Sequence, residues 1–449
     1  VTVTAGTDGT GSITFMAGDS ASNSEGAFAQ IGHGGQSNNG DLSGAIEVTA
    51  ADNITMQGNT GSNAAYAQVG HGGRSAQGDR TGSIEVEATN GFIDVIAGQN
   101  NNNYAQIGHG GHDADFTGAN QGTGTADTIS VTAGTDINVT GAQLDNNNDA
   151  AQSYAQIGHG GQYSDGSHSA AITIGAGGEL DVTAGLSNQA YAQIGHGGLF
   201  NGGGTGGDHS GDIDVETGGD IAVTGGVRER SYAQIGHGGF DNDGSKDGSI
   251  AVESTGGAIT LSGGSTFGDA YAQIGHGGGN TEGVIGATSG AITVNAADSV
   301  SVIGNQSGAA TNYAQIGHGG RSSGLAGETA AGMITVRSTN RDVVLTGANG
   351  GSAESHTHIG HGGILSNYDV PDSAIDIDAG GAVTITGSGA QNSTMIGHGG
   401  ERAAGTVFGG EITVDANNEI RLTGGTNTTA AAQIGHGGAE TDATLSGDI

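Results

Sequence analysis

The tetrapeptide Gly-His-Gly-Gly occurs eleven times along the 449-residue chain, and this repetition constrains the fold more than any other feature. Its histidines follow one another at intervals of 37 to 50 residues, and most copies extend upstream to Tyr-Ala-Gln-Ile-Gly-His-Gly-Gly. A repeat of this length indicates a repeat architecture in which each unit contacts its neighbours. The eleven histidines are His33, His71, His109, His159, His196, His237, His276, His318, His361, His398 and His436.

Two apolar patches lie between successive histidines. The first reads Ile-x-Val, as at residues 46–48 and 84–86, and the second follows eight or nine residues later, as at 54–56 and 93–95. Alternation of β-branched and polar residues is typical of short strands. With the segment Tyr-Ala-Gln-Ile, each repeat therefore contains three predicted strands.

The spacing of these strands predicts an all-β parallel β-helix of about eleven coils, with one repeat of about forty residues per coil. The corner between the two patches is nearly constant in length, whereas the other two corners accept insertions. A helical solenoid would need apolar stripes with a period of 3.6 residues, and this Gly-rich chain has none. A propeller blade would need a fourth strand and usually more aromatic residues.

The domain organisation expected from this pattern is one continuous β-solenoid over residues 1–449. Residues 1–3 resemble a first patch, and Ile449 lies where the next first patch would begin. We therefore expect an uncapped section of a longer repeat array, or a unit that stacks end to end into a filament. At the usual strand spacing of about 4.8 Å, eleven coils give a rod about 50 Å long.

Alternation along the third strand places Ala, Ile and His of the motif on the inner face and Tyr, Gln and Gly on the outer face. The Tyr position also holds Phe28, His356, Ser393 and Ala431, and this variety favours an outward or rim position. Stacked coils place equivalent residues in ladders, and Asn or Gln ladders can form hydrogen bonds along the axis. Besides the histidines, the predicted structural ladders comprise Ile31, Val69, Ile107, Ile157, Ile194, Ile235, Ile274, Ile316, Ile359, Ile396 and Ile434, together with Gln30, Gln68, Gln106, Gln156, Gln193, Gln234, Gln273, Gln315 and Gln433.

The stacked histidines have two interpretations. They could bind Zn²⁺, Ni²⁺ or Cu²⁺, or each imidazole could bond a backbone group and hold its corner. A zinc site needs several converging ligands, and no acidic residue recurs at a fixed offset from His, so the structural role is favoured. We predict no metal and no cofactor in the ladder. Binding of Ca²⁺ at the surface is left as an open alternative. The string at 203–208 is an isolated, imperfect match to a calcium-binding nonapeptide.

The composition excludes several classes of function. A net charge of −36 argues against nucleic acid as a partner, since such binding needs a basic surface. No run of 18 apolar residues occurs, so membrane insertion is not expected. The chain has a single lysine, Lys246, scattered arginines and no irregular zone in which a catalytic site could be recognised. We therefore do not expect an enzyme.

The pattern Gly-x-Ile-x-Val followed by a second Ile-x-Val, seen over residues 82–95 and 211–223, resembles filamentous-haemagglutinin-like exoproteins and autotransporter passengers of Gram-negative bacteria. This resemblance implies a right-handed β-helix exported to the bacterial cell surface. It leads us to expect a structural extracellular fibre or matrix filament whose partner is itself. The alternative is an adhesin that binds glycan or protein through corner loops, of which the longest are 112–127 and 143–153.

Overall fold

The computed structural model describes residues 1–18, 27–114, 128–144, 152–199, 207–286, 290–304, 311–349, 354–387, 389, 393–426 and 430–449. Its regular elements are all strands, and they form a parallel β-solenoid of about eleven coils, as the sequence predicts. Within these residues, no helix has the length and apolar character needed to cross a membrane.

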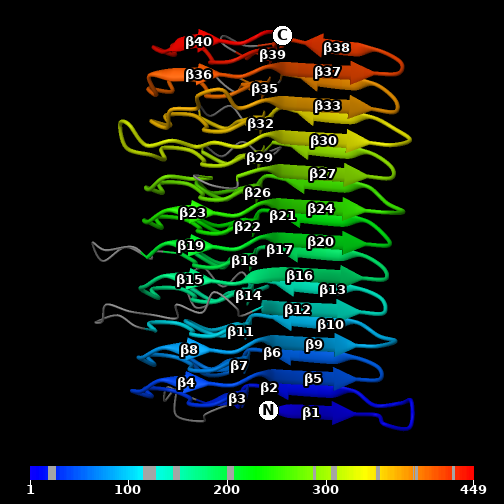
Figure 1. Ribbon diagram of the computed structural model, residues 1–449, viewed down its shortest axis with the longest axis vertical. Helices are drawn as coiled ribbons and strands as arrows, with labels where there is room; N and C mark the ends of the chain where they lie inside the picture. Colours follow the sequence, from blue (N-terminus) through cyan, green and yellow to red (C-terminus); the bar gives the residue numbers. More distant parts are fainter. Residues whose placement is uncertain are drawn as a thin grey trace.

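Three parallel sheets of eleven strands each run the length of the molecule (Figure 1). The first sheet contains β1 Thr2–Ala5, β5 Ile46–Ala50, β9 Ile84–Ala88, β12 Thr128–Ala133, β16 Ala171–Ala176, β20 Ile213–Thr217, β24 Ile250–Ser254, β27 Ile292–Ala296, β30 Ile334–Ser338, β33 Ile375–Ala379 and β37 Ile412–Ala416. The second contains β2 Ile13–Met16, β6 Ile54–Gln57, β10 Ile93–Ile96, β13 Ile137–Thr140, β17 Leu180–Thr183, β21 Ile221–Thr224, β25 Ile259–Ser262, β28 Val300–Ile303, β31 Val343–Thr346, β34 Val383–Thr386 and β38 Ile420–Thr423.

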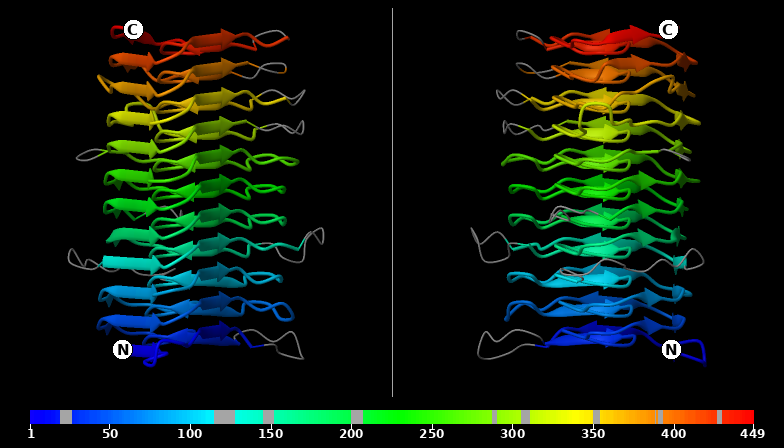
Figure 2. Two further views of the ribbon diagram at one scale, coloured as in Figure 1. Left: turned by 90° about the vertical axis from the view of Figure 1, so that its right-hand side faces the viewer. Right: turned by 60° about the vertical axis from the view of Figure 1, so that its left-hand side comes forward.

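The third sheet is built from the repeated motif itself. It contains β3 Phe28–Ile31, β7 Tyr66–Val69, β11 Tyr104–Ile107, β14 Ala155–Ile157, β18 Ala192–Ile194, β22 Ala233–Ile235, β26 Ala272–Ile274, β29 Ala314–Ile316, β32 Thr357–Ile359, β35 Thr394–Ile396 and β39 Ala432–Ile434. Each strand pairs with its counterpart one coil away, so equivalent residues such as Gln106 and Gln156 face each other across the ladder. Figure 2 shows the resulting straight column, from whose corners the loops project.

Several coils contain a short fourth strand that the sequence analysis did not predict. It lies between the Gly-His-Gly-Gly motif and the next strand of the first sheet, where insertions are frequent and the apolar pattern is weak. These strands are β4 Leu42–Ser43, β8 Arg80–Thr81, β15 His168–Ser169, β19 His209–Ser210, β23 Lys246–Asp247, β36 Val407–Gly409 and β40 Thr444–Ser446. We call the chain from the end of the motif through this position the returning segment.

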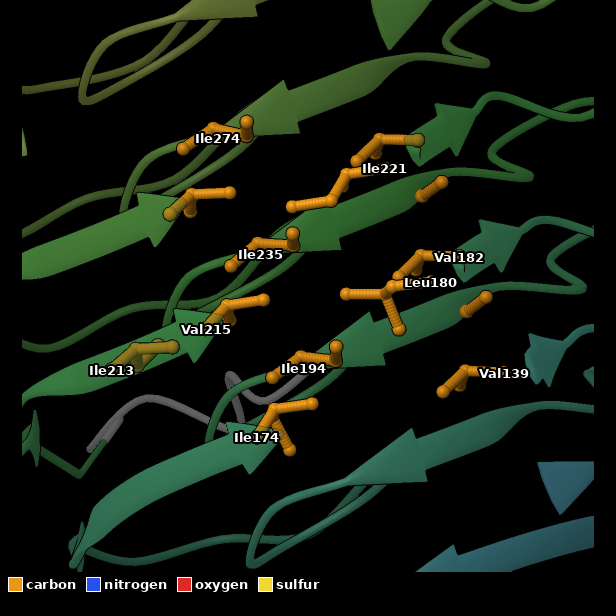
Figure 3. Close-up of a cluster of buried hydrophobic side chains, with 14 of the residues drawn as sticks. Val139, Ile174, Leu180, Val182, Ile194, Ile213, Val215, Ile221, Ile235 and Ile274 are labelled. Carbon is orange, nitrogen blue, oxygen red and sulfur yellow. The ribbon is translucent and has the colours of Figure 1, made fainter. Parts of the chain in front are cut away.

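The core is a column of Ile, Val, Leu and Ala side chains enclosed by the three sheets. Strand alternation points every second residue inward, so that Ile194, Ile235 and Ile274 form one row along the axis (Figure 3). Full burial of one such side chain contributes about 1.5 to 3 kcal/mol. The core is therefore thin, and its stability depends on many equivalent layers.

The constant corner between the first two sheets is held by side chains that bond across coils. Asp136, Asp220 and Asp342 each accept a hydrogen bond at Oδ1 from a main-chain N–H of the following coil, at 2.9, 2.7 and 2.7 Å. A carboxylate that bonds main chain stabilises a tight turn. An insertion here would separate acceptor from donor, which explains why this corner keeps its length.

The returning segment covers the outer face of the third sheet, and this corrects the outward or rim position expected for the Tyr residues. Tyr66, Tyr104 and Tyr232 are fully buried, and the tyrosines pack with Leu199 and Phe240 of the returning segment. The glutamines from Gln68 to Gln315, also expected on the outer face, are buried there. Strand alternation correctly separates the two faces, but it does not show that a second layer of chain covers one of them.

Candidate functional site: the Gly-His-Gly-Gly column

The eleven histidines of the motif form one continuous stack. Neighbouring imidazoles lie 4.7 to 5.0 Å apart between ring centroids, and their planes differ by no more than 8°. Because each His follows the inward Ile by two residues, its ring points to the same side as the core. The imidazoles therefore fill the gap between the end of the third sheet and the start of the first.

In most of these histidines, both ring nitrogens form hydrogen bonds with main chain. In each neighbouring pair, the backbone N–H of one His donates to Nδ1 of the His in the next coil, as from His196 to His237 at 3.0 Å. On the other side, Nε2 of His237 lies 2.8 Å from the Gly211 carbonyl oxygen. An Nδ1 that accepts and an Nε2 that faces a carbonyl define the neutral tautomer with its proton on Nε2.

The carbonyl partner always occupies the same place in the coil. It belongs to the residue two positions before the first inward Ile of the first strand of the same coil, such as Gly82 for His109 and Ser373 for His398. The same bond is formed by His71, His196, His237, His276, His318, His361 and His436. These nine histidines thus close their own coils through Nε2 and bind the preceding coils through Nδ1.

This hydrogen bonding favours the structural interpretation of the ladder. A metal would need a free lone pair, but the Nδ1 lone pair accepts an N–H and Nε2 holds the proton that it donates. In addition, the described residues contain no group of three or more His, Cys, Asp or Glu side chains arranged to hold a metal ion. The geometry supports the structural role of the ladder.

Burial favours the neutral form of the imidazoles inside the stack. It lowers the pKa of His109 and His398 to about 3 and that of His237 and His318 to about 4. For His159, burial is again the main cause of the lowered pKa, and the neighbouring histidines in the stack lower it further. The smaller effect of the neighbours follows from proximity, since a charged imidazole would lie about 5 Å from the next one in a dry environment.

The glutamines of the motif join consecutive coils on the opposite face of the strand. Nε2 of Gln193 donates to the carbonyl oxygens of Gly236 at 3.0 Å and Gly238 at 2.7 Å, both in the Gly-His-Gly turn of the next coil. The same pair of bonds is formed by Gln30, Gln68, Gln106, Gln156, Gln234, Gln273 and Gln315. The expected axial hydrogen bonds therefore form, but they run from amide to main chain and not between amides.

The first glycine of the tetrapeptide is required by the close approach of consecutive coils. A Cβ atom on Gly236 would overlap the Gly275 carbonyl oxygen, and the φ angle of Gly236 is +155°. The last glycine of the tetrapeptide faces the tyrosine column, so that a Cβ on Gly239 would overlap the Tyr232 hydroxyl. Gly, His and Gln of the motif are thus parts of one inter-coil contact.

The tyrosines stack in a second column beneath the returning segment. Tyr66, Tyr104, Tyr154, Tyr191, Tyr232, Tyr271 and Tyr313 lie 4.6 to 5.0 Å apart between ring centroids, and Phe28 and His356 continue the stack at its two ends. Burial raises the pKa of Tyr104 and Tyr232 well above the usual value. The sequence offered a signal for this burial, because none of the eleven motifs carries an acidic residue, Lys or Arg within its strand.

A set of buried basic side chains that the sequence did not single out as a group lies in the short fourth strands. Arg80, His168, His209 and Lys246 are all buried there. His168 stacks on His209 at 5.3 Å, and Nζ of Lys246 donates to the carbonyl oxygens of Asn242 at 2.6 Å and Glu282 at 2.8 Å. Burial lowers the pKa of Lys246 to about 7. The positive charges of Arg80 and Lys246 lower the pKa of two histidines of the column, His109 and His276 respectively.

Two features that the sequence analysis weighed lie largely outside the described residues. They are the corner loops 112–127 and 143–153, of which 115–127 and 145–151 are not described, and the calcium-like string at 203–208, of which 203–206 are not described.

Comparisons of the chain with protein-family models, with curated proteins and with solved structures find no match.

Proposed function

We propose that this chain is a section of a structural fibre, built from stacked β-solenoid coils and located outside the cell or on the surface of a bacterium. One observation carries the proposal. The same His, Gln and Gly contacts join nearly every pair of neighbouring coils, so the motif is used to build length. The resemblance to filamentous-haemagglutinin-like exoproteins supports the location, and the net charge of −36 supports a soluble, self-repelling surface.

The role proposed here is mechanical and not catalytic. The repeated side chains of the motif are used inside the rod, because the imidazole nitrogens and the glutamine amides bond main chain. Such a rod resists bending through its three continuous sheets, and its partner is a further length of the same structure. An adhesin that binds glycan or protein through corner loops remains the alternative.

Electron microscopy of the native material tests this proposal. Thin, unbranched fibres that continue far beyond about 50 Å, with an axial repeat of about 4.8 Å, are the expected result. Short isolated rods that end in other domains would contradict the fibre and favour an adhesin stalk. Binding of the 449-residue chain to an array of glycans, measured in parallel, distinguishes the two, since a purely structural fibre should bind none of them specifically.

A further inference from the structure

The outer face of the second sheet carries no charged residue over five successive coils. The strands concerned are β21, β25, β28, β31 and β34, and each contributes two outward side chains that are partly exposed. We call this surface the neutral face. It consists of Ala222, Thr224, Thr260, Ser262, Ser301, Ile303, Val344, Thr346, Thr384 and Thr386.

The other two sheets do not offer such a surface. In the same five coils, the outer face of the first sheet carries Glu216, Glu253, Arg337, Asp376 and Asp378. The outer face of the third sheet is covered by the returning segment. In a chain with a net charge of −36, the neutral face is therefore the uncovered sheet surface whose strands present no charge to a second equally acidic molecule.

We propose that the neutral face is the contact surface for a second copy of this chain, packed face to face with its solenoid axis antiparallel about a two-fold axis along β28. A second copy has the same spacing between coils, so small Thr, Ser and Val side chains stay in step along the whole contact. A two-fold arrangement is the commonest symmetry of protein pairs and makes the surface complementary to itself.

The residues that flank the neutral face support this symmetry. Asp181 lies on β17, three strands before β28, and Arg421 lies on β38, three strands after it. Both are the second residue of their strand and belong to the same outward column. A two-fold axis along β28 therefore places Asp181 of each copy opposite Arg421 of the other. Burial, Asp136 and Asp220 raise the pKa of Asp181, so this carboxylate would gain from a cation.

The proposed contact between the two copies is small, so it has to be tested at high protein concentration. Seven coils at about 4.8 Å, each about 13 Å wide, give about 450 Å² per copy. This area lies at the low end for specific protein pairs, so association should be weak in a chain of this length. The pairing proposal depends on neither the location nor the fibre role proposed above. The pairing can therefore be disproved while those two proposals stand.

Sedimentation of the purified chain at high concentration and physiological salt is the first experiment. We expect a reversible monomer–dimer equilibrium. Asp181→Arg should raise the dissociation constant at least tenfold because two arginines would then face each other at both ends of the contact. Arg421→Asp should do the same by bringing carboxylates together, and the double exchange should restore the wild-type value. A monomer at all concentrations, or single variants that dimerise normally, would overturn the proposal.

Cross-linking locates the contact independently. The chain has no cysteine, so Ser301→Cys places one thiol on β28, where the two-fold axis brings it close to its own counterpart. A short bis-maleimide reagent should link this variant into a dimer. Thr293→Cys is the matched control, since it lies in the same coil on the outer face of the first sheet and should stay monomeric. Equal cross-linking of both variants would contradict the assigned face.

A regular array of Thr and Ser could also bind the surface of an ice crystal. Thermal hysteresis of the freezing point, measured on the same protein, tests this other occupant. Ice shaping by a chain that stays monomeric would overturn the pairing proposal and assign the neutral face to ice. The second copy would be established as the occupant if the protein shows no hysteresis and if the variant that combines Asp181→Arg with Arg421→Asp dimerises as the wild-type chain does.

Discussion

At the scale of the residue, each histidine of the motif works as a neutral two-sided connector. His237 accepts from the His196 N–H and donates to the Gly211 carbonyl, and its ring packs between its neighbours in the stack. Lysine or arginine could only donate, and a carboxylate could only accept. The neutral imidazole is the side chain that can do both and stack, which accounts for its presence in all eleven coils.

Replacement of His237 by Phe keeps the stacking but removes both hydrogen bonds. We expect the free energy of unfolding to fall by about 2 to 4 kcal/mol, because a buried N–H and a buried carbonyl lose their partners. Amide hydrogen exchange at His196 should accelerate most, since its N–H donates to His237. Protection at His196 equal to that of the wild-type chain would show that the Nδ1 bond has no role.

Replacement of Gln193 by Met tests the amide connector. Met395 occupies the equivalent position in another coil, so the side chain fits the space. The loss of two bonds to the next coil should destabilise the chain by about 1 to 3 kcal/mol in denaturant titrations. Gln57→Met, on the partly exposed outer face of β6, is the control and should change stability by less than about 0.5 kcal/mol.

At the scale of the element, the fold class, three of the strands in each coil and the register between coils could be predicted from alternation and spacing. The burial of Tyr104 and Gln106 could not, because alternation assigns two faces to a strand without showing what covers each. The short strand Lys246–Asp247 was also missed, since its two polar residues carry no apolar pattern. The hydrogen bonds of the imidazoles required atomic positions, although the absence of charge from the motif strands was a usable signal of burial on both faces.

The turn of the tetrapeptide gives a sharp test of coil spacing. Gly236→Ala should prevent normal stacking of two coils, because its Cβ would overlap the Gly275 carbonyl oxygen. Gly175→Ala is the matched control, since that glycine lies on β16 and its added Cβ would meet only the Thr132 side chain, at 3.6 Å. We expect G236A to lose several kcal/mol or fail to fold, and G175A to be neutral or slightly stabilised. Equal stability of both variants would contradict the close approach.

At the scale of the whole molecule, stability is distributed over equivalent layers and not concentrated in one centre. Each coil adds a thin slice of core, one imidazole and, in most coils, one amide connector, so the energy of the rod is close to a sum of nearest-neighbour terms. A condition that weakens every layer slightly therefore has a large effect on the whole rod, because the small losses of free energy add along the stack.

Acid is such a condition, and its effect has a definite sign. The pKa of His109 and His398 is about 3 in the folded chain, and that of His237 and His318 is about 4, whereas an unfolded histidine has a pKa near 6.5. Between these values the unfolded chain binds more protons, so stability is unaffected above about pH 7 and is lost as the pH falls from about 6.5 toward 4. Arg80 and Lys246 add to the cost of charging His109 and His276, whereas Asp212 and Asp247 favour the charged form of His237.

Each histidine of this kind should contribute a slope of about 1.4 kcal/mol per pH unit in that window. Denaturant titrations at pH 7.5, 6, 5 and 4.5 should therefore show a steep, cooperative loss of stability. His237→Phe should reduce the slope by one such increment because it removes one titrating group from the column. A stability that stays constant from pH 7.5 to 4.5, or an unchanged slope in the variant, would mean that protonation of the unfolded histidines is not what limits the fold in acid.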